Sequence, residues 1–364
     1  MNEPKVAIVY LSYHSDEYLP EMIEALKKST YPKDKTALVI VDNPHPEFGS
    51  SIKKIEELVL PLSKNELPEV IILPQTVNKG FCGGNNVGID WAVKNGFDYI
   101  FWHNQDGYVG ETCIQKMVEA LEADKTIGCA QALILLHGTT KINTAGNSFN
   151  YLGFGFIPNF GVEESSIKLP PVSEVGYASG AALMMRAGLV KQYGKLNEDL
   201  FAYHEDIEYS LRLKITGYKV VIVSTAKFFH KYVFNRSASK FYFLERNRYA
   251  VLLMYYKTGT LILLLPMLIF MELGLLVFFI YKGWFREKIK IYQYWLKVDN
   301  MKLWVKKREM IQVIRKITDR ELLKLTTGNI KFGEKQGMDS PLLRYIANPL
   351  MIIYKRVVEL LVFW

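Results

Sequence analysis

Cysteine is scarce in this sequence, with three residues among 364, and no two of them form a Cys-x-x-Cys pair. An odd number of widely spaced cysteines favours neither a disulfide framework nor a zinc site, so a reducing compartment is the expectation. The first residues also lack an apolar run followed by a small-residue cleavage site, and no signal peptide is predicted. The cysteines are Cys82, Cys113 and Cys129.

Glycine is missing from the turn after the first apolar run, residues 6–11. The turn reads Ser-Tyr-His-Ser, whereas a dinucleotide-binding unit carries Gly-x-Gly-x-x-Gly directly after its first strand. The absence argues against an NAD-dependent enzyme. It argues equally against a nucleotidyltransferase, which would place a glycine-rich loop bearing Arg or Lys at this point.

Excess positive charge is absent from most of the chain. The formal net charge is +8, and residues 282–325 alone hold thirteen Lys or Arg against five Asp or Glu, a difference of +8. The remaining residues therefore balance. Charge confined to one segment favours an anionic partner such as a membrane surface, and no nucleic-acid partner is expected.

Apolar runs and helical patterns alternate through the first part of the chain. Residues 6–11, 37–41 and 70–73 have the composition of buried strands, and helical patterns lie between them, one at about residues 51–62. This alternation predicts an α/β fold with a mostly parallel central sheet and right-handed crossovers.

A run rich in glycine and asparagine, Asn78-Lys-Gly-Phe-Cys-Gly-Gly-Asn-Asn86, precedes a further helical pattern. Backbone amides at a helix start, with glycines that permit close approach, would suit a diphosphate. A plain strand-to-helix connection has the same composition, so both interpretations stand on this segment alone.

Polar residues end the next strand, residues 99–102, at Asn104-Gln-Asp106-Gly. Ligands of open α/β sheets lie at the carboxyl ends of strands. A carboxylate with an amide two residues before it suits a divalent cation held against a phosphate. The alternative is a turn in which Asp106 bonds its own backbone.

Two acidic residues, Glu205 and Asp206, stand where a helical pattern begins, with Ile207 and Leu211 on one face. A carboxylate at a helix N-terminus is suited to act as a general base. The alternative is that Asp206 caps the helix.

In their order along the chain these motifs resemble glycosyltransferase family 2 on the GT-A nucleotide-sugar-binding fold, over about residues 5–250. The likeness is nearest to the rhamnosyltransferase-like and cell-surface polysaccharide branch. The resemblance implies catalytic roles for Asp206, with Glu205, and an acceptor side at Ser179 and Gly180. It implies a metal site of Asp106, Asn104 and His230 that takes Mg²⁺ or Mn²⁺. The implied nucleotide-sugar contacts are Ser12, Tyr13, Asp42, Asn78, Gly80, Gly83, Gly84, Asn85, Asn86 and Asn104.

Several positions depart from the family pattern, and one of them, Glu208 where Asp is common, is expected to matter little. His14 replaces an Asn of the first loop, Pro44-His-Pro46 follows Asn43 in place of Gly-Ser, and Gln105 replaces a Pro. The first position of the metal motif is an amide, so cation binding is expected to rest mainly on Asp106.

The implied function is an inverting, metal-dependent transfer from a UDP- or dTDP-sugar, dTDP-rhamnose among the candidates. The acceptor is a hydroxyl of a lipid-linked or cell-surface glycan. The alternative is a catalytically silent relative that serves as a scaffold or regulatory subunit, against which the presence of Asp106 and Asp206 argues.

The sequence predicts a catalytic domain at residues 1–250 and a helical membrane-associating region at 251–364. Residues 261–281 are long and apolar enough to span a bilayer, but basic residues flank both ends, 282–325 on one side. Because positive residues prefer the cytoplasmic side, a re-entrant or in-plane hairpin, bent near Pro266 or around Glu272-Leu273-Gly274, is favoured over a crossing. Residues 341–364 form an amphipathic candidate. The alternative is that these two segments bury against each other or against a second subunit of a homo-oligomer. The expected location is the cytoplasmic face of a membrane.

Overall fold

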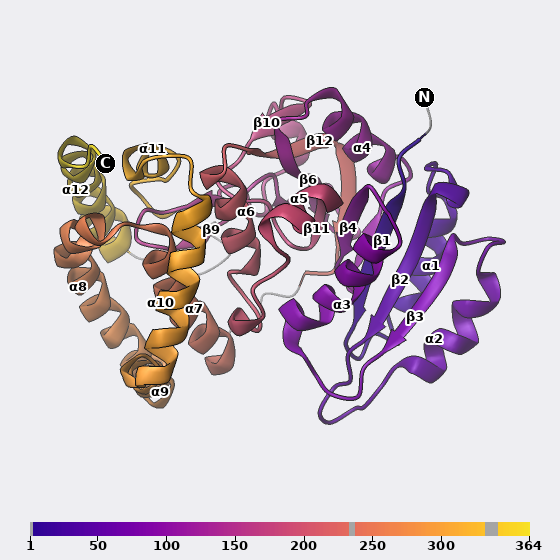
Figure 1. Ribbon diagram of the computed structural model, residues 1–364, viewed down its shortest axis with the longest axis horizontal. Coiled ribbons are helices and arrows are strands. Elements are labelled where there is room, and N and C mark those ends of the chain that lie inside the picture. The colour runs from indigo at the N-terminus through magenta and orange to yellow at the C-terminus, as the bar shows by residue number, and fades with distance from the viewer. Residues whose placement is uncertain (1–2, 233–236, 332–340) are drawn as a thin grey trace. The chain divides into compact units, whose positions relative to one another are not determined.

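The computed structural model describes residues 3–232, 237–331 and 341–364, and the chain divides into two compact units (Figure 1). The first unit consists of Met1–Gly146, Asn159–Leu213 and Tyr218–Val233. The second consists of Asn147–Pro158, Lys214–Gly217 and Phe234–Trp364.

The first unit is built on a sheet in which ten strands of the described residues pair in the order β10-β12-β6-β11-β4-β1-β2-β3, with β5 attached to β12 and β7 to β6. The neighbours β4, β1, β2 and β3 are parallel, β12 is parallel to β6, and β11 lies antiparallel between β4 and β6. The predicted α/β fold with a mostly parallel sheet is confirmed. The strands are β1 (Val6–Ser12), β2 (Thr36–Asp42), β3 (Glu69–Pro74), β4 (Tyr99–His103), β5 (Gly107–Val109), β6 (Ile127–Leu136), β7 (Ile142–Thr144), β10 (Val172–Glu174), β11 (Ala182–Arg186) and β12 (Lys219–His230).

The strand order fixes which residues meet. Because β11 is antiparallel to both β4 and β6, these two strands point the same way, and β12 follows β6. The carboxyl ends of β1, β2, β4 and β12 therefore lie at one edge of the sheet, together with the amino end of β11. Every motif singled out at a strand end comes to this edge.

Helices cover both faces of the sheet. They are α1 (Leu19–Lys27), α2 (Ile52–Leu58), α3 (Gly80–Lys94), α4 (Cys113–Ala123), α5 (Ala187–Tyr193) and α6 (Glu205–Ile215), with short 3₁₀ turns η1 (Lys33–Lys35), η2 (Leu60–Leu62), η3 (Glu164–Ser166) and η4 (Glu198–Leu200). The helix predicted at about residues 51–62 ends at Leu58, before Pro61, which has no N–H to continue it.

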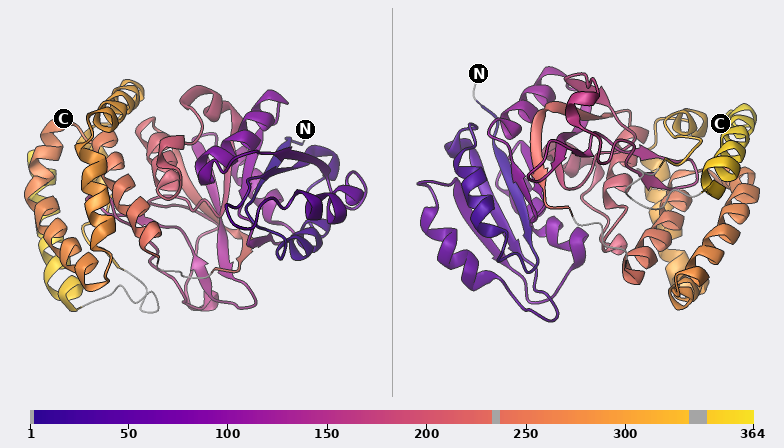
Figure 2. Two further views of the ribbon diagram at one scale, coloured as in Figure 1. Left: turned by 90° about the horizontal axis from the view of Figure 1, so that it is seen from below. Right: turned by 180° about the vertical axis from the view of Figure 1, so that it is seen from behind.

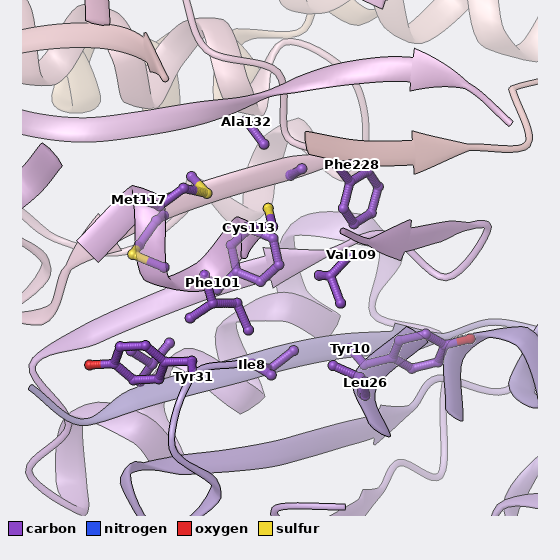
Figure 3. Packing of buried hydrophobic residues seen from close by; sticks show 14 of the residues in the cluster. Ile8, Tyr10, Leu26, Tyr31, Phe101, Val109, Cys113, Met117, Ala132 and Phe228 are labelled. Carbon is purple, nitrogen blue, oxygen red and sulfur yellow. The ribbon is translucent and has the colours of Figure 1, made fainter. Parts of the chain in front are cut away.

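The hydrophobic core lies against one face of β1 and continues to β12 (Figure 3). Ile8 and Tyr10 point into this cluster beside Leu26 of α1, Met117 of α4 and Phe228 of β12. Both β1 and β2 are buried along their whole length, as their unbroken apolar sequences suit strands covered on two faces.

Helix α3 packs on the opposite face of β1, and its glycines make the approach close. A Cβ added at Gly84 would stand 2.4 Å from Leu11 Cδ1, and one at Gly88 would stand 2.5 Å from Val9 Cγ1. The helix begins at Gly80, inside the glycine run, rather than after it. Close helix–strand packing therefore accounts for Gly84 without any ligand.

The second unit is mainly helical. It contains α7 (Ala238–Tyr255), α8 (Thr258–Tyr281), α9 (Phe285–Leu296), α10 (Val298–Ile314), α11 (Asp319–Lys324), the π-helical turn η6 (Leu343–Ala347) and α12 (Asn348–Leu361), with a small hairpin of β8 (Ser148–Phe149) and β9 (Gly155–Phe156). Within the described residues, α8 is the one helix long and apolar enough to cross a membrane. It is continuous through Pro266 and Glu272, so the hairpin predicted to bend at either residue is wrong: an uninterrupted helix runs through both points.

Replacing Gly88 by Ala is expected to lower the free energy of unfolding by about 1–3 kcal/mol, because its Cβ would overlap Val9 and force α3 away from β1. The matched control is Gly188→Ala in α5, where a Cβ would meet nothing within 4 Å. That variant is expected to match or slightly exceed wild type. Urea unfolding followed by circular dichroism measures both, and equal midpoints for the two variants would contradict the packing role of Gly88.

Candidate functional site

Asp42 and Asn43, at the end of β2, tie two loops together. Asp42 accepts hydrogen bonds from the hydroxyl of Ser50 and from the backbone amide of Ser51, the latter at 3.1 Å, and is 1% exposed. Asn43 donates to Asn78 Oδ1 at 2.9 Å and accepts from the backbone amide of Lys79 at 2.9 Å. The end of β2 is thereby joined to the segment that enters α3.

Three of the departures from the family pattern, at His14, at Pro44-His-Pro46 and at Gln105, lie in one place. His14 stacks on Phe48 with ring centroids 4.3 Å apart, and His45 lies 4.7 Å from the rings of both Phe48 and Tyr13. Gln105 accepts from the Tyr13 backbone amide at 2.6 Å and donates to the Tyr13 carbonyl at 3.0 Å. The substituted residues thus connect the loops after β1, β2 and β4 to one another.

Asp106 and His230 meet at the carboxyl ends of β4 and β12. Their Oδ1 and Nε2 atoms are 2.9 Å apart, and the amide nitrogen of Asn104 lies 2.6 Å from Asp106 Oδ1 and 3.2 Å from His230 Nε2. The pairing of Gly107 with His230 in the β5–β12 ladder sets this distance, since it places the loop bearing Asp106 beside the end of β12.

This cluster fits a divalent cation. The other ring nitrogen of His230, Nδ1, lies 3.1 Å from Asn143 Oδ1, a contact that suits the tautomer with its proton on Nδ1. Nε2 then directs its lone pair at the Asp106 carboxylate, where a shared cation would satisfy both groups. Within the described residues no three His, Cys, Asp or Glu side chains gather as metal ligands. The site offers the Asp106 carboxylate and the His230 imidazole, and the Asn104 amide would have to turn its oxygen toward them to act as a third ligand.

Glu205 and Asp206 open α6 at the same edge of the sheet. Asp206 accepts from the backbone amides of Ile207 at 2.8 Å and Gly180 at 3.4 Å. Neighbouring Ser179 is held by its own amide, which donates to Gln131 Oε1 at 2.7 Å. The predicted acceptor-side pair, Ser179 and Gly180, therefore lies against the predicted base.

Burial controls the ionisation of this acidic pair. It raises the pKa of Asp206 to about 6, and burial together with the Asp206 charge raises the pKa of Glu205 to about 8. Glu205 Oε2 is buried without a hydrogen-bond partner in the described part of the chain. Burial thus favours the protonated form of Glu205 more strongly than that of Asp206, which is the more readily ionised carboxyl of the pair.

The backbone just before α6 is strained. Phe201, Tyr203 and His204 have φ values of 64°, 67° and 68°, a region that side-chain-bearing residues seldom adopt. The Phe201 ring also covers Gly80, where an added Cβ would stand 2.6 Å from it. Such strain is typical of segments whose geometry serves a site.

Asn85 and Asn86 are directed into the protein. Asn85 donates to the carbonyl of Phe81 within α3, and Asn86 bonds the backbone of Leu196 and the carboxylate of Glu198. Both are at most 2% exposed. They hold α3 and the loop before α6 in place. Gly83 is buried beside Lys79 in the first turn of α3.

Sequence reasoning missed Asn143 and Ser50. Asn143 lies in β7, in a stretch without clear periodicity, and nothing local marks it as the partner of a histidine 87 residues away. Ser50 follows the Pro44-His-Pro46 departure, and its bond to Asp42 appears only once the loop is closed.

Comparison with known proteins places this geometry in context. A family model described as "Glycosyl transferase family 2" matches residues 7–193, just over half of the chain. The low-salt glycan biosynthesis hexosyltransferase Agl10 of Haloferax volcanii is 24% identical over 140 residues, 38% of this chain and 44% of that protein. The crystal structure of GalNAc-T7 with UDP, GalNAc and Mn²⁺ is similar in fold, with a TM-score of 0.56, 15% identity, and coverage of 71% of this chain and 49% of that one. The chain thus spans less than half the length of either relative.

Removing the Glu205 carboxyl should change how stability depends on pH. A carboxyl whose pKa is raised by folding keeps its proton in the folded state while the unfolded chain releases it, so stability falls as pH rises from about 4.5 to about 8. Glu205→Gln cannot ionise, and its urea midpoint should fall less than that of wild type between pH 5 and pH 8. Glu24→Gln, at an exposed position of α1, should keep the wild-type slope. An unchanged slope in Glu205→Gln would show that Glu205 is ionised in the folded protein.

Proposed function

The chain belongs to glycosyl transferase family 2, and from this premise we propose that it transfers a sugar from a nucleotide-sugar donor. The proposed acceptor is a hydroxyl of a glycan or of a lipid-linked molecule, and the proposed transfer inverts the anomeric carbon. The main support for the proposal is that Asp106, Asn104 and His230 contact one another at one edge of the sheet. Asp206 lies at the same edge. A UDP- or dTDP-sugar is the proposed donor, and dTDP-rhamnose is the candidate that the likeness to the rhamnosyltransferase-like branch suggests.

Asp106, with His230 and Asn104, would hold Mg²⁺ or Mn²⁺, and Asn143 would keep the His230 ring in the required orientation. Such a cation neutralises the donor diphosphate, which makes the nucleoside diphosphate a better leaving group. The crystallisation of GalNAc-T7 with UDP and Mn²⁺ agrees with this choice.

The nucleoside side of the site is proposed to consist of Ser12, Tyr13, Asp42 and Asn78. Asp42 is fixed by Ser50 and Ser51, and Asn78 by Asn43, so both are pre-positioned. We propose that Gly80, Gly83, Gly84, Asn85 and Asn86 contribute by shaping α3 and its neighbouring loop.

On the acceptor side, Asp206 is proposed to take the proton of the attacking hydroxyl. The new bond joins this oxygen to the anomeric carbon as the bond from that carbon to the diphosphate oxygen breaks, and the electron pair leaves with the nucleoside diphosphate. A protonated Glu205 leaves Asp206 as the single carboxylate of the pair, and Ser179 and Gly180 line the approach to it.

We propose that residues 1–250 carry out this chemistry and that residues 251–364 associate with the membrane. Placement at the cytoplasmic face of a membrane would bring the transferase to nucleotide sugars and to a lipid-linked acceptor at once. The apolar α8 and the basic residues 282–325 support this assignment.

The chemistry can be tested on the purified full chain with a panel of UDP-, dTDP- and GDP-sugars, in Mn²⁺, in Mg²⁺ and in EDTA. Asp206→Asn is expected to lower turnover by at least about 100-fold, because general-base catalysis contributes that much, while donor binding persists. Asp106→Asn should weaken donor binding in Mn²⁺ but not in EDTA, as measured by calorimetry.

Asp34→Asn, at an exposed position of η1, is the matched control and should behave as wild type. Full turnover in both site variants would refute the proposed mechanism. Donor binding by wild type without turnover of any sugar nucleotide would instead favour the scaffold role.

A further inference from the structure

Helix α8 leaves a continuous apolar stripe uncovered. Only 11% of its most apolar 18-residue stretch is buried. Apart from Phe270 and Tyr281, its exposed large side chains recur every three or four residues and so share one side of the helix. They are Ile262, Leu265, Ile269, Leu273, Val277 and Ile280, each between 51% and 67% exposed.

Helix α12 lies beside α8 and adds a second stripe (Figures 1 and 2). Tyr354 donates to the carbonyl of Leu263 at 2.7 Å, and the Trp364 indole donates to the hydroxyl of Thr260 at 3.0 Å. The exposed apolar residues of α12 again recur at helical spacing: Leu350, Ile353, Val357, Leu360 and Leu361.

One flank of α8, beside the stripe, is held by a half-buried charge network. Glu272 accepts hydrogen bonds from the hydroxyls of Tyr249 and Tyr292 and pairs with Lys288 at 2.8 Å. Lys288 is completely buried and also pairs with Glu245 at 3.3 Å. Separating α8 from α7 and α9 would leave this lysine with one carboxylate in place of two, at a high energetic cost.

This network determines how α8 can meet a bilayer. Because Glu272 is bound to α9, a crossing α8 would draw α9 into the hydrocarbon with it. Arg286 and Lys290 of α9 are exposed, and cations at that depth are costly. The arrangement that buries the stripe while keeping these cations in water has α8 lying in the plane of the interface.

The charge of the second unit indicates which surface it would meet. Among its described residues, twelve Lys or Arg are exposed against three Asp or Glu. Lys257 precedes α8, and Arg356 stands on α12 beside Val357 of the stripe. An anionic headgroup layer complements this excess, whereas a second copy of the same basic unit would repel it.

We propose that the exposed stripes of α8 and α12 form a docking surface for an anionic lipid bilayer, on which α8 lies in plane without crossing. The proposal deepens the membrane association proposed above and does not depend on the proposed chemistry of the first unit.

The test uses the purified full chain and vesicles of phosphatidylcholine with or without phosphatidylglycerol. Wild type should float with the anionic vesicles. The double variant Ile269→Glu, Leu273→Glu should lower the partition coefficient by about 100-fold, because each buried side chain of this size is worth about tenfold. Circular dichroism first confirms wild-type helix content.

The matched control is Val305→Glu, an exposed apolar position of α10 beside Lys302 and Lys306. It should partition within twofold of wild type. Equal binding by the double variant and wild type, or a loss confined to Val305→Glu, would place the surface elsewhere and overturn the proposal.

The orientation of α8 is read from fluorophores on single cysteines at positions 262, 269 and 277, quenched by lipids labelled at graded depth. An in-plane helix gives one shallow depth at all three positions. A deep maximum at position 269 would indicate a crossing helix. A vesicle-independent dimer that the double variant dissociates would instead identify a second copy as the occupant.

Donor hydrolysis by wild type in vesicle-free buffer reports on the first unit alone. Intact hydrolysis without vesicle binding would therefore contradict the docking surface alone. Vesicle binding without hydrolysis would contradict the proposed chemistry alone.

Discussion

The candidate site depends on one constraint of topology: β1, β2, β4 and β12 run in the same direction and end at the same edge of one sheet. Asp106 and His230 are 124 residues apart in the chain and 2.9 Å apart in the fold because of it. The antiparallel β11 contributes by starting at this edge, which brings Gly180 against Asp206. No single loop contains the site, so its geometry depends on the pairing of the strands.

Buried charge serves two different ends in the two units. Glu205 is buried and Asp206 half-buried, and Asp206 is held by backbone amides; desolvation raises the pKa values of both carboxyls, so that Asp206 can accept a proton near neutral pH. Buried Glu245 and half-buried Glu272 both pair with the buried Lys288, which locks α8 to its neighbours. The cost of desolvating a charge thus sets the pKa values of the acidic pair in the first unit. In the second unit the same cost holds α8 against α7 and α9.

Strand-end motifs could be placed from the sequence because a polar break after an apolar run is a local signal. The role of the glycine run was harder to assign. Gly84 proved to pack on Leu11, and Asn86 to bond Leu196, since a glycine that admits a phosphate and one that admits a side chain look alike in sequence. The prediction of a hairpin at Pro266 was wrong because a proline can be accommodated within a helix, and α8 runs through this residue without interruption.

By itself the sequence determined the α/β fold, the family and the order of the polar motifs, because each rests on local periodicity or on a short pattern. Only the tertiary structure decided that Asn143 orients His230, that Gln105 joins two loops and that Glu272 binds α8 to α9. These contacts join residues from 16 to 92 positions apart, between elements that only the packed chain brings together. Local patterns specify which elements form, and the pairing of distant elements specifies which side chains meet.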